Sequence, residues 1–192
     1  MPVIDIVVPR HLHQKLKTLA ELDQETNGVF FYTPQTARGR TLWQVHSFLL
    51  TGRGDDEYVS SHPIQVRVAN LMLNHLSRQT PRVDWGFVKV HTHCRGTGRS
   101  LGEKWFHQFS EQDMDAVRAQ LRDNPDYTLM MYSPTHHLAA GHSRNLYNVA
   151  VIDSTPEHRR NSARLENLAK RLRLQHRIPE IRFEVTARSR RR

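Results

Sequence analysis

Hydrophobic residues recur along this chain at two spacings, one typical of strands and the other of helices. Short apolar runs rich in β-branched and aromatic residues predict extended segments. These runs occupy residues 3–8, 29–32, 41–50, 83–90, 127–132 and 146–152. Apolar positions three and four residues apart predict helices at residues 10–24, from Pro63 onward, from Ser110 to a stop before Pro125, and at residues 156–175.

The order of these segments predicts an α/β fold. Residues 34–40 contain Pro34 and Gly39 and form a predicted turn, so segments 29–32 and 41–50 pair as a hairpin. Predicted strands outnumber helices, which favours a mixed β-sheet flanked by α-helices. We expect a layered α/β sandwich. It has three layers if the first and third helices cover one face and the second covers the other.

Composition narrows the class of protein. The 192 residues are 38% hydrophobic and 24% charged, which is typical of one globular domain with a real core. The chain has one cysteine and so no internal disulfide, and we expect a reducing, cytoplasmic environment. No stretch approaches about 18 consecutive apolar residues, so a membrane span is not expected. Residues 1–11 have the pattern of a first strand rather than a signal peptide.

The net charge of +9 is concentrated at the C-terminal end. Residues 157–192 hold twelve Lys or Arg and four Glu, a net +8, whereas the other 156 residues hold 16 basic and 15 acidic groups, a net +1. We therefore divide the chain into a body, residues 1–156, and a basic extension, residues 157–192. The extension predicts an amphipathic helix, a short strand at residues 181–186 and a disordered end.

The extension has two interpretations. Its helix packs its leucines on the body and exposes a solvated basic face, or that face binds an acidic partner or nucleic acid. Nucleic acid is the less expected partner. Binding of single strands favours several aromatic residues, and Phe183 is the only Phe, Tyr or Trp in the extension.

The most informative motif is His91-Thr92-His93. Residues i and i+2 of a strand point to the same side, about 6.6 Å apart, so these two imidazoles can share one metal ion. Asp113, in the first turn of the helix that Ser110 caps, is the candidate third ligand. Two His and one carboxylate leave a zinc ion one open position, the layout of a catalytic site. The alternatives are a chance His pair among 13 histidines and an ordinary helix cap.

The order of Glu25, His-Thr-His and Ser-x-x-Asp resembles the JAMM (MPN/JAB) zinc metallopeptidase family. Glu25 begins Glu-Thr-Asn-Gly followed by Val-Phe-Phe, similar to the family's glutamate turn before an early strand. The resemblance covers roughly residues 3–152 and implies the family's fold, a mixed sheet flanked by helices in a cytidine-deaminase-like layered sandwich. Two features depart from the pattern. Sixteen residues, Cys94 to Phe109, stand where the family has a short loop, and Cys94 replaces a frequent proline.

The resemblance implies one Zn²⁺ per chain, held by His91, His93 and Asp113. Glu25 would be the general base, and Ser110 would donate a hydrogen bond to the oxyanion. It further implies a prokaryotic-type enzyme that cleaves the amide bond after the C-terminal glycine of a ubiquitin-like protein, free or in a conjugate. A non-catalytic scaffold of the same fold, or a protein acting through its basic extension, remains an open alternative.

Overall fold

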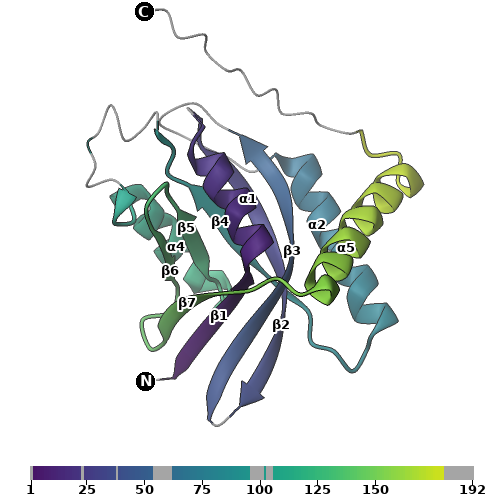
Figure 1. Ribbon diagram of the computed structural model, residues 1–192, viewed down its shortest axis with the longest axis horizontal. Coiled ribbons are helices and arrows are strands. Elements are labelled where there is room, and N and C mark those ends of the chain that lie inside the picture. Colours follow the sequence, from purple (N-terminus) through teal and green to yellow (C-terminus); the bar gives the residue numbers. More distant parts are fainter. Residues whose placement is uncertain are drawn as a thin grey trace, which may run out of the picture.

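The computed structural model describes residues 2–22, 24–37, 39–53, 62–95, 102 and 106–179. Within these residues it is a mixed α/β fold, with a seven-stranded sheet and four helices (Figure 1). The elements in chain order are β1 (Val3–Pro9), α1 (Arg10–Ala20), β2 (Thr26–Ala37), β3 (Arg40–Arg53), α2 (Pro63–Gln79), β4 (Gly86–Thr92), α4 (Glu111–Asp123), β5 (Leu129–Tyr132), β6 (His137–Ala140), β7 (Leu146–Ile152) and α5 (Pro156–Gln175).

The sheet has the strand order β6-β5-β4-β2-β3-β1-β7. Strands β2 and β3 form a long antiparallel hairpin at its centre, and β4 pairs antiparallel with the other side of β2. Three further pairs, β1 with β3, β1 with β7 and β4 with β5, are parallel. The expectation of a mixed sheet flanked by helices is therefore confirmed.

Helix α1 covers one face of the sheet. Its Leu12 and Leu16 join a buried cluster with side chains from β1 to β5, including Val88 and Val90 of β4. The two edge strands, β6 and β7, contact each other. The sheet therefore curls around α1, which lies in front of it in Figure 1.

Helices α2 and α5 cover the opposite face. Successive side chains of a strand point to opposite sides, so Phe30 of β2 joins the α1 cluster while Val29 and Phe31 face the other way. There they pack with Met72 of α2 and Leu168 of α5. The core thus consists of two apolar layers, one on each side of the central hairpin.

Helix α4 lies behind the sheet in Figure 1, on the same side as α2. The three-layer arrangement considered from the sequence, with the first and third helices on one face, is therefore not the one observed. The reason is topological. Strands β4 and β5 are parallel neighbours, so α4 is a crossover helix. Connections between parallel strands are right-handed, and this rule determines which face of the sheet α4 covers. The spacing of apolar residues within the helix carries no information about that face.

Several predicted boundaries also need correction. The first helix ends at Ala20 rather than residue 24. The predicted turn at residues 34–40 is mostly strand, because β2 runs on to Ala37 with Pro34 paired to Trp43. Proline is tolerated there since β4 pairs with β2 only as far as Tyr32, so β2 has one neighbour beyond that point. Strand β6 was not predicted.

The predicted helix at residues 156–175 is confirmed, with Thr155 as its cap. Leu165, Leu168 and Leu172 of this helix are buried in a cluster with side chains of α2, as the packing interpretation of the extension expects. The predicted strand at 181–186 and the chain end lie outside the described residues, as does most of the segment from Cys94 to Phe109. No described helix combines the length and apolar character needed to cross a membrane.

Candidate metal centre

Strand β4 positions the two histidines of the predicted site. Val88 and Val90 face the α1 cluster, so alternation places His91 and His93 on the other side of the sheet, where α4 lies. His93 follows the last residue of β4, and its backbone N–H donates to the carbonyl of Tyr132 on β5 at 2.7 Å. The residues are 4% and 2% exposed, respectively. Both imidazoles are therefore held by the rigid centre of the sheet.

The first turn of α4 supplies the carboxylate. Ser110 is the N-cap, and its Oγ accepts from the backbone N–H of Asp113 at 3.0 Å. Asp113 Oδ2 in turn accepts from the backbone N–H of Ser110 at 2.8 Å, which completes a capping box. The cap fixes where α4 begins, and it aims the carboxylate at the end of β4. The capping interpretation and the ligand interpretation are thus compatible.

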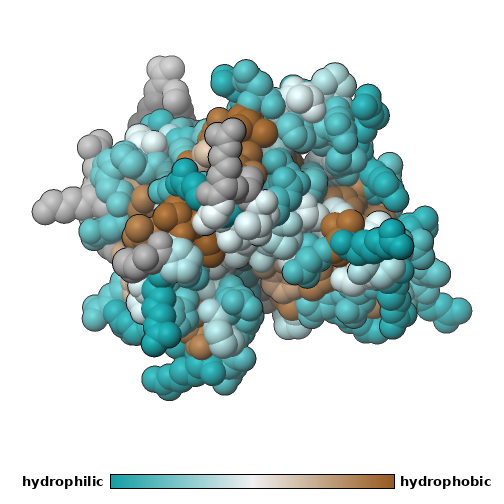
Figure 2. Space-filling model, turned by 90° about the horizontal axis from the view of Figure 1, so that it is seen from below, coloured by the Kyte–Doolittle hydropathy of each residue, from teal (hydrophilic) through white to brown (hydrophobic). Residues whose placement is uncertain are grey.

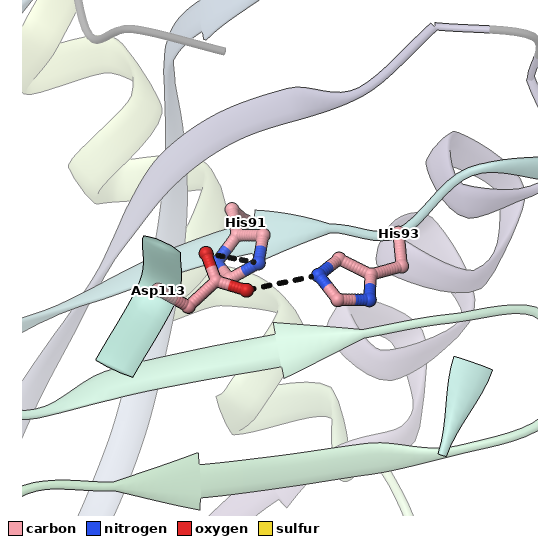
Figure 3. Close-up of side chains that lie close together, drawn as sticks. All are labelled: His91, His93 and Asp113. Atoms are coloured by element: carbon pink, nitrogen blue, oxygen red, sulfur yellow. Dashed lines mark hydrogen bonds and ion pairs between the residues drawn. The ribbon is translucent and has the colours of Figure 1, made fainter. Parts of the chain in front are cut away.

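The three side chains converge on one point (Figure 3). Asp113 Oδ2 lies 3.2 Å from His93 Nε2, and Asp113 Oδ1 lies 3.4 Å from His91 Nε2. One ligand atom from each residue lies within 4.8 Å of the other two. Among the described residues, this is the one group of three or more His, Cys, Asp or Glu side chains with such spacing. We call it the His–His–Asp cluster.

The cluster passes two tests of fit to a metal ion. Two ligand atoms bound to one tetrahedral zinc at about 2.0–2.2 Å lie roughly 3.3–3.5 Å apart, close to the observed N···O distances. His91 Nε2 is also buried and has no hydrogen-bond partner among the described residues, although Asp113 lies near it. A buried nitrogen without a partner is costly, and a metal ion would satisfy it.

The protonation states of the cluster suit a metal. Burial lowers the pKa of His91, and Asp113 only partly offsets this, so the imidazole is neutral at pH 7. Burial acts to raise the pKa of Asp113, but its close contacts with His91, His93 and Ser110 outweigh burial and hold that pKa far below its usual range. Neutral imidazole and ionised carboxylate are the forms that bind metal ions.

Glu25 immediately precedes β2 and does not belong to the cluster. Strand β2 pairs with β4 so that Asn27 stands opposite His91, the last pair of that register. If the same register is continued by two positions, Glu25 falls opposite His93, and directly opposed residues project to the same face. Glu25 is 7% exposed. It is thus a buried carboxylate at the end of the strand that pairs with β4, outside the His–His–Asp cluster.

Thr92 is a residue whose role the sequence did not reveal. It lies between the two histidines and faces the other side of the sheet. Its Oγ1 accepts from the backbone N–H of Thr26 at 2.9 Å, and the two hydroxyls lie 3.1 Å apart. This buried contact holds the residue after Glu25 against the residue before His93, and so limits how far Glu25 and His93 can separate.

Ser110 and Cys94 differ in their relation to the cluster. The Ser110 hydroxyl donates to Asp113 Oδ2, 2.7 Å away, so in this structure it holds the Asp113 carboxylate. Cys94 is fully buried but does not belong to the His–His–Asp cluster.

Comparisons with known proteins add no family to this picture. No family model matches the chain, and no curated protein is similar to it in sequence. The case for a function therefore depends on the residues and their geometry.

Proposed function

We propose that this protein is a zinc-dependent peptidase that hydrolyses the amide or isopeptide bond after the C-terminal glycine of a ubiquitin-like protein. The observation that carries the proposal is the buried convergence of His91, His93 and Asp113 from two separate elements. The neutral form of His91 and the ionised form of Asp113 match what zinc requires, and His91 Nε2 has no hydrogen-bond partner among the described residues. The motif order, similar to that of JAMM peptidases, supplies the reaction class.

Each residue near the cluster has a proposed task. Zinc held by two imidazoles and one carboxylate supplies an activated water and a Lewis acid for the scissile carbonyl. Glu25 takes the proton of the attacking water and returns it to the leaving amine. Ser110 keeps Asp113 in place, and its hydroxyl can turn to the oxyanion once Asp113 Oδ2 is otherwise engaged. No covalent bond between enzyme and substrate is needed.

The substrate follows from the resemblance rather than from a described contact. A glycine-ended tail is narrow and flexible, and an enzyme can hold such a tail by its backbone groups. The alternative is a non-catalytic scaffold of the same architecture. A scaffold has no need of a buried His–His–Asp cluster or of a carboxylate beside it.

The decisive test is a cleavage assay with ubiquitin-like proteins extended beyond their terminal Gly-Gly. The wild type should release the extension, a chelator should stop it, and added zinc should restore it. Glu25→Gln should keep its zinc and lose turnover, whereas the exposed neighbour variant Glu111→Gln should match the wild type. Zinc binding without cleavage of any extended substrate would favour the scaffold. Wild-type turnover in Glu25→Gln would remove Glu25 from the mechanism.

A further inference from the structure

A second concave site lies between α2, α5 and the central strands, and we call it the α2–α5 groove. Its volume is about 990 Å³. Arginines of α5 line one wall, and His75 of α2, His46 of β3 and Trp85 contribute to the rest. The two helices that line it, α2 and α5, lie side by side at the right of Figure 1. This volume is at the upper end of the range for small-molecule pockets.

The α2–α5 groove is positively charged. Its lining includes Arg160, Arg164 and Arg171 but no Asp or Glu. The arginines recur at intervals of four and seven residues, so they share one side of α5 along roughly 16 Å of its axis. All three are exposed, and none forms an ion pair with a carboxylate of the described residues. Arg171 contacts His75 Nε2 at 3.3 Å, a contact that brings no carboxylate. A row of guanidinium groups without carboxylate partners among the described residues attracts an anionic chain.

Other lining groups distinguish a peptide from a nucleic acid. Four carboxamides face the groove, Gln35, Gln79, Asn161 and Asn167. Each offers a donor and an acceptor, which match the alternating C=O and N–H of a peptide, whereas a phosphate backbone offers acceptors alone. Trp85 is the one Trp, Tyr or Phe in the lining. It already contacts the ring of His46 and donates to Thr80, and a single aromatic residue cannot stack a run of bases.

Polar groups also dominate the lower surface as a whole. Viewed from below, the molecule is largely hydrophilic, and hydrophobic residues form separate patches between polar ones (Figure 2). A partner on this side therefore meets charged and hydrogen-bonding groups more than a continuous apolar face.

The groove is separate from the His–His–Asp cluster. Both lie on the face of the sheet opposite α1, but Thr33 of β2 lines the groove, whereas Asn27 of β2 pairs with His91 of the cluster. Six residues of strand separate these two positions, roughly 20 Å at about 3.3 Å per residue. A ligand in the groove would not touch a bond undergoing cleavage at the cluster.

We propose that the α2–α5 groove binds an acidic, extended segment of a partner protein. Guanidinium groups of α5 pair with its Asp or Glu side chains, and the carboxamides pair with its backbone. The proposal is independent of the proposed peptidase activity. If that activity is also correct, the groove is a second contact for a substrate or conjugate with an acidic surface segment.

The test uses the full chain and a fluorescent peptide of about ten residues in which Glu alternates with small residues, long enough to span the arginine row. A matched peptide carries Gln in place of Glu. The groove variant is Arg164→Glu with Arg171→Glu. The control variant is Arg159→Glu with Lys170→Glu, which lie on the same helix outside the groove lining and change the charge equally. Fluorescence anisotropy gives the affinities, and zinc content is measured in each variant.

The acidic peptide should bind the wild type and the control variant within about threefold of each other, and the groove variant should bind it about tenfold or more weakly. Zinc content should not change, because the substitutions are far from the cluster. Equal weakening in both variants would overturn the proposal, as would equal binding of the Gln peptide. Tighter binding of a single-stranded oligonucleotide that displaces the peptide would assign the groove to nucleic acid instead.

Discussion

Replacing Ser110 by alanine tests how the structure holds its proposed metal ligand. The hydroxyl makes two contacts with Asp113, donating to Oδ2 at 2.7 Å and accepting from its backbone N–H at 3.0 Å. The backbone N–H of residue 110 also donates to Oδ2, and that bond survives in Ser110→Ala. The variant therefore frees part of the carboxylate without deleting it.

The expected size of the effect follows from these two bonds. A hydrogen bond to a charged group contributes about 1.5–3 kcal/mol, and loss of a helix N-cap costs about 1 kcal/mol. We expect the metal-free variant to lose about 2.5–4 kcal/mol in free energy of unfolding. Residues that orient a metal ligand typically change metal affinity by about 10–100-fold, so zinc binding should weaken by that factor.

Competition with a chromophoric chelator measures the zinc affinity, and urea denaturation measures the stability. Ser110→Thr keeps a hydroxyl at the same position and should restore most of both quantities. Zinc affinity in Ser110→Ala within about twofold of the wild type would refute the reasoning, because Asp113 would then need no help from this hydroxyl. Lost turnover with unchanged zinc affinity would instead assign Ser110 to the oxyanion alone.

Three further predictions concern the framework around the site. Leu168→Ala removes a buried side chain between α5 and α2 and should cost about 2–5 kcal/mol in urea denaturation, whereas Leu174→Ala, 82% exposed, should cost less than about 0.5 kcal/mol. Gly28→Ala should destabilise by about 1–3 kcal/mol, because the added Cβ would lie 2.2 Å from the ring of Phe48 and 2.8 Å from a backbone oxygen; a wild-type melting temperature would contradict this. Burial lowers the pKa of His13 to about 4, so the unfolded chain takes up its proton first and stability should fall as pH drops from 6.5 toward 4. His13→Leu should flatten that decline, and an unchanged pH profile would show that another group causes it.

Local patterns predicted most of the elements because local chemistry determines them. Pro63 and the Ser110 cap marked two helix starts correctly, and the leucine stripe predicted α5 with its observed bounds. The hairpin turn was misplaced because Pro34 was read as part of a turn. A proline is tolerated within a strand that has one neighbouring strand at that point, and the sequence does not show how many neighbours β2 has there. Strand β6 is short and lacks a strong alternating pattern, so the sequence gives little sign of it. It is recognised as a strand by its hydrogen-bonded pairing with β5.

The site was predictable in its members but not in its contacts. Strand alternation correctly placed His91 and His93 on one side, and motif order suggested Asp113 as the third member. The buried nitrogen of His91 without a partner in the described chain, and the Thr26–Thr92 contact, depend on three-dimensional packing. The α2–α5 groove was likewise hidden, because its walls come from three segments far apart in the sequence, within residues 33–46, 75–85 and 160–171.

Zinc stoichiometry by native mass spectrometry, with elemental analysis of the same sample, tests the central claim most directly. The purified wild-type chain should carry one zinc ion. A folded His91→Ala variant should carry none, and Asp115→Asn, an exposed carboxylate on the same helix as Asp113, should keep its ion. A well-folded wild type that stays metal-free after incubation with zinc, or zinc retained in His91→Ala, would contradict the account.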